Sequence, residues 1–182
     1  TGPATTVDAK GRFRFEGVGP GRWWLIAEGP VIGRAPGGRP VLGTGARRGT
    51  QTVDMPAASA GRVEIPLSAA VEVNGSIVLD DSPGTRAECY ADASVSLTPL
   101  APLDADARCT TGISERGRFE CRRLYPGVYR LSIGGLDRCW LQRVVDQGAP
   151  APGWVVTLSE GEGPRNVELH LSAASGKVRG AV

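Results

Sequence analysis

The stretch GRFECRRLYPGVYRL at residues 117–131 decides the fold, because nearly the same sequence, GRFRFEGVGPGRWWL, already stands at residues 11–25. The two stretches align without a gap at an offset of 106 residues, which is 117 less 11. A second pair repeats the pattern, with VEIPLSAA at 63–70 and VELHLSAA at 167–174. A period of this length is too long for a solenoid repeat and suits one small domain. We therefore expect the chain to be a slice through an array of similar domains.

The repeat predicts three parts of the chain. Residues 1–70 form a partial β-sandwich unit that lacks its first strands, residues 71–174 form a complete unit, and residues 175–182 form the first strand of a further unit. The last assignment depends on VNGSI at 73–77, which returns as VRGAV at 178–182. A partial unit has an uncovered sheet edge, which is a liability. We expect the orphan strand to fold back onto that edge.

Strand patterns dominate both copies, and no stretch of about 11 or more residues has helical periodicity. The alternating or β-branched and aromatic runs are 12–15, 23–27, 62–67, 71–79, 93–97, 128–133, 140–145, 154–158 and 167–171. Between them lie turn sequences such as DSPG, SERG and YPG. Regular strands with turn signals and no helices predict an all-β fold of tandem antiparallel β-sandwiches.

Strand parity assigns the inward face of the two aligned stretches. Side chains two residues apart share a face of a strand, so Phe119 and Cys121 point to one side, as do Tyr129, Leu131 and Ile133. The matching inward set of the first copy is Phe13, Phe15, Trp23, Leu25 and Ala27. The Pro-Gly pair between the strands makes a tight turn. The residues of the aligned stretch are therefore expected to have a structural role, in the core and in the turn, rather than a chemical one.

Composition excludes some classes of partner. The chain is 41% hydrophobic and 22% charged, with a net charge of +2 whose acids and bases are interspersed. Without a basic run there is no reason to expect nucleic acid or an anionic membrane as a partner. No apolar run approaches the roughly 20 residues of a membrane helix, so direct membrane insertion is not expected.

All four cysteines, Cys89, Cys109, Cys121 and Cys139, fall in the second copy. An even number in one domain favours two disulfides and an oxidising compartment, with three connectivities, and reduced core cysteines remain the alternative. No C-x-x-C is present, which argues against zinc. Cys109 and Cys121 lie almost opposite one another across the ISERGR turn, so this pair is favoured, which leaves Cys89 with Cys139.

The pattern from Thr5 to Trp23, T-x-x-x-x-x-G-x-F-x-F-x-x-V-x-P-G-x-W, and its echo from Thr111 to Tyr129 resemble the carboxypeptidase regulatory-like domain. VNGSIVLDDS and ADASVSLTPL look like the first two strands of that family. The resemblance implies a transthyretin-like, Greek-key sandwich of about seven strands in a bacterial secreted, periplasmic or outer-membrane-associated protein. The cysteines and the insertion at 101–109 depart from the family pattern.

Residues that could carry chemistry are few. His170, the single histidine, is expected on the outer face of the last strand, and Pro66 stands in its place in the first copy. No G-x-S-x-G sequence presents a nucleophile to it. GVGPG at 17–21 is followed by a strand rather than a helix, so it is a turn and not a phosphate loop. The aspartates of 103–107 and 80–81 are too few for a calcium loop. We expect no catalytic, cofactor-binding or metal-binding residues.

Three tryptophans are candidates for ligand contact. Trp24, Trp140 and Trp154 are the aromatic residues that parity and loops allow to be exposed, whereas Trp23 has the inward parity of Tyr129. An exposed aromatic ring can stack on a sugar, but it is as often covered by a loop, and the Gly-rich segment 29–50 is expected to provide such a loop.

The function expected from these observations is that of a non-catalytic spacer or interaction module of a larger protein. Its partners are neighbouring domains of the same chain, and a polysaccharide or another envelope protein is the further option. The alternative is a carbohydrate-binding module attached to an extracellular enzyme or outer-membrane receptor. A hydrolase is disfavoured because no nucleophile and base are paired in the sequence.

Overall fold

The computed structural model describes residues 3–34, 36, 40–56, 62–80, 87–101 and 107–173. The chain divides into two compact units, one made of residues 1–27 and 49–66 and the other of residues 28–48 and 67–182. The strand predicted at 175–182 lies outside the described residues, so its existence and the boundary after residue 70 stay predictions. The described residues contain strands and two short 3-10 turns, η1 (Ala87–Tyr90) and η3 (Pro152–Trp154), and no α-helix.

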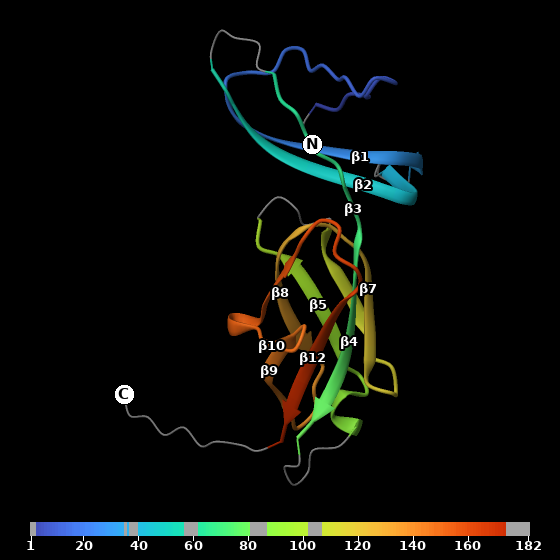
Figure 1. Ribbon diagram of the computed structural model, residues 1–182, viewed down its shortest axis with the longest axis vertical. Coiled ribbons are helices and arrows are strands. Elements are labelled where there is room, and N and C mark those ends of the chain that lie inside the picture. The colour runs from blue at the N-terminus through green and yellow to red at the C-terminus, as the bar shows by residue number, and fades with distance from the viewer. Residues whose placement is uncertain are drawn as a thin grey trace, which may run out of the picture. The chain divides into compact units, whose positions relative to one another are not determined.

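The larger unit contains two β-sheets that enclose a common core (Figure 1). One has five strands in the order β10-β9-β12-β4-β7, and the other has four in the order β11-β8-β5-β6. The strands are β4 (Val71–Leu79), β5 (Ser94–Pro99), β6 (Cys109–Gly112), β7 (Arg118–Leu124), β8 (Gly127–Gly134), β9 (Trp140–Asp146), β10 (Ala149–Pro150), β11 (Val155–Leu158) and β12 (Arg165–Ser172). The all-β prediction is confirmed, and the strands expected from residue 71 onward coincide with β4, β5, β8, β9, β11 and β12 within a few residues.

One strand pair departs from the antiparallel expectation. β12 pairs with β4 in parallel register, with Val167 opposite Gly75 and Leu169 opposite Ile77, while its other neighbour β9 is antiparallel. Hairpins force an antiparallel pairing, but β4 and β12 are separated by the rest of the sandwich. No local connection therefore fixes their relative direction.

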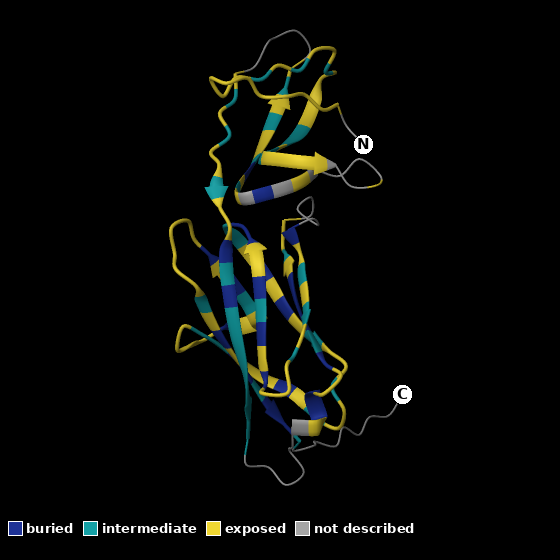
Figure 2. Ribbon diagram, turned by 90° about the vertical axis from the view of Figure 1, so that its right-hand side faces the viewer, coloured by how far each residue is buried: buried dark blue, intermediate teal, exposed yellow. Residues whose placement is uncertain are grey.

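The predicted inward faces of the sandwich are confirmed. Phe119, Cys121, Tyr129 and Leu131 are at most 5% exposed, and Ile133 packs against them. Figure 2 shows the same alternation as buried and exposed bands along the strands of the sandwich. The period-two pattern of the sequence thus places the core between the two sheets.

Both expected disulfides are present. Cys109–Cys121 joins β6 of the four-stranded sheet to β7 of the five-stranded sheet, with the two Cα atoms 5.9 Å apart. Cys89–Cys139 joins η1 to the residue before β9, with a Cα–Cα distance of 6.0 Å. β6 and β7 are both edge strands, so the first bridge fastens the sheets to one another at an open side of the sandwich.

A glycine in the middle of β4 is required by its neighbour. Gly75 lies opposite Phe119 in the β4–β7 ladder. A Cβ atom added to Gly75 would lie 1.9 Å from Cζ of the Phe119 ring, so the ring occupies the space that a side chain would take. Covering a strand glycine with a cross-strand aromatic restores the packing that the glycine lacks.

The N-terminal part of the chain forms a three-stranded sheet of β1 (Gly21–Arg34), β2 (Pro40–Met55) and β3 (Ser68–Ala69). The expectation of a Gly-rich loop over residues 29–50 is wrong, because strands β1 and β2 continue through most of this segment. The strands expected at 12–15 and 62–67 are also not formed. In the sandwich, the aligned strands β7 and β12 both pair with β4. Among the described residues, no strand pairs with 12–15 or 62–67 as β4 does with β7 and β12.

The turn at Asp8–Arg12 and the turn at Ser114–Arg118 have the same hydrogen bonds. The backbone N–H of the first residue donates to the last carbonyl at 2.9 Å and 2.8 Å, and the glycine N–H donates back to the first carbonyl at 3.0 Å and 2.8 Å. Gly11 and Gly117 have φ angles of 77° and 68°. A left-handed glycine after a type I turn is a common hairpin geometry, so the two copies share it at the predicted offset.

A second local feature recurs at the same offset. The Tyr129 hydroxyl donates to the carbonyl of Tyr125 at 2.8 Å and accepts from its N–H at 3.2 Å. In the first copy Trp23 Nε1 donates to the carbonyl of Gly19 at 2.9 Å. In each case an aromatic residue beside the Pro-Gly turn holds the backbone four residues earlier.

Candidate functional site

The three candidate tryptophans lie on three different sheets or their flanks. Trp24 is on β1 and is half-buried, with its indole Nε1 buried and without a hydrogen-bond partner among the described residues. Trp140 opens β9 and is 38% exposed. Trp154 ends η3 just before β11 and is 40% exposed. The structure therefore does not bring them onto one sheet face.

Trp154 has a strained backbone. Its φ is 58° and follows Gly153 at 63°, so two consecutive residues are in the left-handed region. A bulky residue there costs of order 1–3 kcal/mol. The Trp154 side chain lies partly in solvent, directly before β11, which is an edge strand of the four-stranded sheet.

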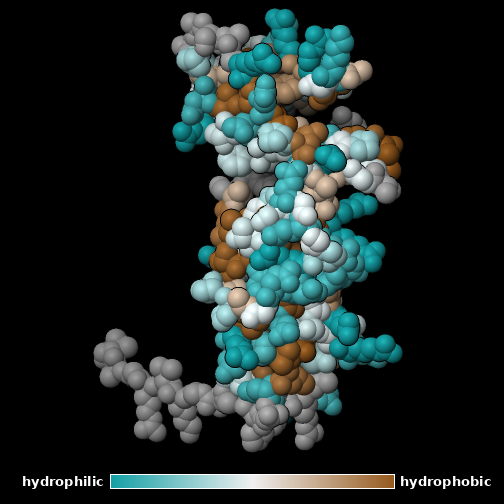
Figure 3. Space-filling model, viewed as in Figure 1, coloured by the Kyte–Doolittle hydropathy of each residue, from teal (hydrophilic) through white to brown (hydrophobic). Residues whose placement is uncertain are grey.

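Exposed apolar side chains of the sandwich are scattered. Figure 3 shows hydrophobic side chains on one face as separate patches among hydrophilic ones. The large apolar residues of the sandwich with an exposed fraction of 38–43% are Leu100, Val128, Trp140 and Trp154. Leu100, just after β5, and Val128 on β8 are neighbours, because the N–H of Leu100 donates to the carbonyl of Val128 at 2.9 Å, whereas Trp140 opens β9 and Trp154 ends η3. Small exposed apolar groups of this kind are normal for a protein surface.

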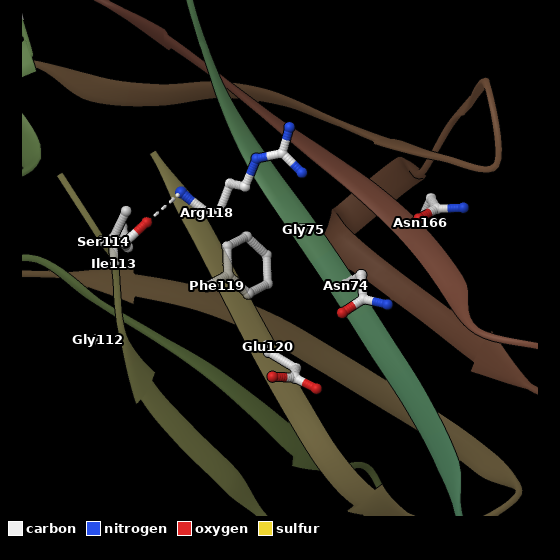
Figure 4. Close-up of a pocket in the computed structure, with 9 residues that line it drawn as sticks. All are labelled: Asn74, Gly75, Gly112, Ile113, Ser114, Arg118, Phe119, Glu120 and Asn166. Atoms are coloured by element: carbon white, nitrogen blue, oxygen red, sulfur yellow. Dashed lines mark hydrogen bonds between the residues drawn. The ribbon is translucent and has the colours of Figure 1, made fainter. Parts of the chain in front are cut away.

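An open depression of about 800 Å³ lies where β6 and β7 meet at the edge of the sandwich. Its polar side chains come from four elements, with Asn74 on β4, Asn166 on β12, Arg118 and Glu120 on β7, and Ser114 in the turn before β7 (Figure 4). Ser114 Oγ is already engaged, since it accepts the backbone N–H of Arg118 at 3.0 Å.

The electrostatics of this depression are set by an ion pair. Glu120 accepts hydrogen bonds from the Arg122 guanidinium, which lowers the pKa of the carboxyl group below its ordinary value. Phe119 also lines the depression, but only 5% of its surface is exposed because its ring covers Gly75. The depression therefore offers hydrogen-bonding groups for a polar ligand but no stacking surface.

His170 lies on the outer face of β12, as predicted, and is half-buried between two charged side chains. Arg143 Nη2 lies 3.2 Å from its Nδ1, and Glu168 Oε2 lies 3.2 Å from its Nε2. A guanidinium only donates, so Nδ1 must accept and Nε2 carries the proton that is donated to Glu168. Both ring nitrogens of His170 therefore have a charged side chain within hydrogen-bond distance.

A further ion-pair cluster closes the loop between β11 and β12. Arg165 donates to both carboxylate oxygens of Asp146 at 2.8 Å and to Glu162 at 2.9 Å. The hydrogen bonds that Arg165 donates to Asp146 raise the pKa of Arg165, and the hydrogen bond from the backbone N–H of Ser159 lowers the pKa of Glu162. These groups neutralise one another, so we assign the cluster to stabilisation of the loop.

Of the aspartates considered for calcium, Asp80 is among the residues that the structure describes. No group of three or more His, Cys, Asp or Glu side chains that could hold an ion occurs there. Asp81 and residues 103–106 lie outside the described residues. The GVGPG segment at 17–21 leads directly into β1, which begins at Gly21, so the prediction that a strand follows it is confirmed.

The role of Arg48 on β2 was not predicted. Its side chain is only 4% exposed, its Nε lies 3.4 Å from Glu28 Oε1, and its Cζ lies 5.7 Å from the centroid of the Tyr125 ring. Tyr125 precedes the Pro-Gly turn between β7 and β8. The pattern could not reveal this contact, because β2 was not expected as a strand.

Neither a family model nor a curated protein matches this sequence. None of the described helical turns has the length and apolar character needed to cross a membrane. The two disulfides suggest an oxidising, extracellular-type environment.

Proposed function

We propose that this chain is a tandem pair of carboxypeptidase regulatory-like β-sandwich repeats that acts as a non-catalytic spacer or interaction module of a larger bacterial secreted or cell-envelope protein. The recurrence of the Asp8 and Ser114 turns and of the Trp23 and Tyr129 hydrogen bonds at one offset supports the repeat. The disulfides support an extracellular location.

The observation that carries the spacer function is the short connection between sheets. β3 of the three-stranded sheet ends at Ala69 and β4 of the sandwich begins at Val71, so Ala70 alone connects them. A linker of one residue cannot act as a flexible tether. Within the larger unit, buried Arg48 adds a second contact of residues 28–48 with the sandwich, because it is paired with Glu28 and its Cζ lies over the Tyr125 ring.

NMR relaxation of backbone amides tests this function. A spacer predicts that the amides of β2 and of β12 report one rotational correlation time, and that a Gly-Gly-Ser insertion after Ala70 separates the two values. Arg48→Ala should increase the difference between them, whereas Arg47→Ala, an exposed neighbour on the same strand, should not. Two separate correlation times in the unmodified chain would contradict the spacer function.

Carbohydrate binding is a second candidate because of one observation, the strained and 40% exposed Trp154. Affinity electrophoresis against soluble polysaccharides tests it, with Trp154→Ala, Trp140→Ala and Trp24→Ala compared with the unmodified chain. Retardation that Trp154→Ala abolishes would support sugar binding at this edge of the sandwich. If no polysaccharide retards the chain, the tested polysaccharides are excluded as ligands and the spacer function remains the proposal.

A further inference from the structure

The middle of β4 carries an asparagine followed by a glycine, Asn74 and Gly75. The chain has one other asparagine, Asn166 on β12, and the two asparagines lie opposite one another in the β4–β12 ladder. Both line the open depression at the edge of the sandwich (Figure 4). They differ in the residue that follows, since Asn166 precedes Val167. The two asparagines therefore form a matched pair within one chain.

Asparagine is one of the chemically labile residues of proteins, above all when a glycine follows it. The backbone nitrogen of Gly75 can attack the side-chain carbonyl carbon of Asn74, so that a five-membered succinimide ring forms and the amide nitrogen leaves as ammonia. Water then opens the ring at either carbonyl, which gives aspartate or isoaspartate. Glycine has no side chain to shield its nitrogen, whereas the β-branched Val167 crowds the nitrogen that follows Asn166. The chemistry therefore favours Asn74.

The packing of the sandwich requires the glycine of this pair. Gly75 lies opposite Phe119 in the β4–β7 ladder, and the Phe119 ring occupies the space that a side chain at position 75 would take. A larger residue there would collide with the ring and disturb the core. The labile Asn-Gly pair is thus a consequence of how β4 packs.

The same sheet protects the pair while β4 is in place. Gly75 is paired with Phe119 on one side and with Val167 on the other. Ring closure needs the nitrogen of Gly75 to turn toward the Asn74 side chain, which an extended backbone held between two strands does not allow. In addition, Asn74 Nδ2 donates to Glu72 Oε1 at 3.1 Å. The reaction therefore requires local opening of β4.

We propose that Asn74 is a site of spontaneous covalent modification that becomes reactive only when β4 opens, and that its products prevent β4 from pairing as before. Opening of the sandwich thereby becomes irreversible, and the frequency of opening sets the lifetime of the folded unit.

Aspartate at position 74 disturbs the outer face of the five-stranded sheet. Asn74 donates to Glu72 and lies opposite Glu120 on β7. A carboxylate at this position cannot donate and adds a third negative charge, while Arg122 is already paired with Glu120. Like charges directly opposite one another on neighbouring strands are destabilising. The product therefore weakens the pairing of β4 with β7.

Isoaspartate disturbs the backbone itself. Its main chain contains an additional carbon atom, so the residues before and after position 74 cannot both keep their register. β4 lies between β7 and β12, so two ladders are affected at once. A shifted register moves Val73 or Ile77 away from the inward face that they share.

Peptide mapping by mass spectrometry of the full, disulfide-bonded chain tests the reactivity. Samples are incubated in mildly alkaline buffer with and without urea, and conversion of amide to acid is followed at both asparagines. In urea, Asn74 should convert at least about tenfold faster than Asn166, because Val167 crowds the nitrogen after Asn166. Without urea, conversion of Asn74 should be at least about tenfold slower than in urea, because only open chains react.

Refolding after the incubation in urea tests the consequence. Chains with aspartate or isoaspartate at position 74 should remain unfolded or unfold at a lower urea concentration than unmodified chains. Asn74→Gln removes the five-membered ring closure and should refold completely. Asn166→Gln is the matched control and should lose refolding as the unmodified chain does. Asn74→Asp isolates the effect of the charge and should lower the urea midpoint.

Three outcomes would overturn the proposal. They are equal conversion of the two asparagines in urea, equal conversion of Asn74 with and without urea, and modified chains that refold with an unchanged urea midpoint.

Discussion

The two disulfides close loops of very different length, and this predicts different contributions to stability. Cys89–Cys139 spans 50 residues and Cys109–Cys121 spans 12. We consider the double variants C89A/C139A and C109A/C121A. Each pair contains one buried and one half-buried cysteine, so the packing lost in the two variants is similar.

The difference in the free energy of unfolding follows from the entropy of the unfolded chain. A bridge that closes 50 residues contributes about 4.1 kcal/mol at 25 °C, and one that closes 12 contributes about 2.8 kcal/mol. C89A/C139A should therefore be less stable than C109A/C121A by about 1.3 kcal/mol. Both variants should still fold under native conditions if the core of the sandwich supplies the remaining stability.

Urea unfolding followed by the amide signals of Leu169 and Leu131 reports the sandwich alone. Both residues are fully buried and lie on opposite sheets of the sandwich, so their transitions should coincide. The unmodified protein and each single variant are the controls. If C109A/C121A were the less stable variant, fastening of the sheets between β6 and β7 would outweigh loop length, and the entropic reasoning would be refuted.

Three further changes test the packing, the turn and the electrostatics. Gly75→Val should lower the free energy of unfolding by about 3 kcal/mol in urea titrations, since its side chain overlaps the Phe119 ring, and an unchanged midpoint would contradict the required glycine. Tyr129→Phe should cost about 2 kcal/mol by the same measurement, because it leaves the buried N–H and carbonyl of Tyr125 without the hydroxyl. Hydrogen bonding lowers the pKa of Glu162 from 4.5, so its stabilisation is present above that pH and is lost as the pH falls through the folded-state pKa. Glu162→Gln should therefore show a smaller loss of stability between pH 6 and pH 3 than the unmodified protein, and equal losses would exclude this role.

Much of the sandwich could be predicted because its strands carry period-two patterns. The run VEVNGSIVL coincides with β4, and the alternation of Phe119 and Cys121 correctly gave the inward face of β7. The disulfide pairing could also be predicted, because the turn between β6 and β7 brings Cys109 opposite Cys121. These are local properties that neighbouring residues determine.

Features that depend on residues far apart in the chain could not be predicted from the local sequence. The parallel pairing of β4 with β12 has no local signal. The segment 29–50 is rich in glycine and lacks alternation, yet it forms strands because β1 and β2 pair with each other. Arg48 reads as an ordinary surface cation in the sequence and is buried only because Glu28 and Tyr125 surround it.

The two copies of the opening motif separate what the local sequence encodes from what a partner supplies. Both copies form the same turn, with a glycine in the left-handed region at Gly11 and at Gly117. The residues after the second turn form strand β7 because β4 supplies its hydrogen bonds, whereas GRFRF after the first turn remains outside any strand. A sequence pattern therefore specifies the turn and the inward side chains, but a strand exists only where another strand pairs with it.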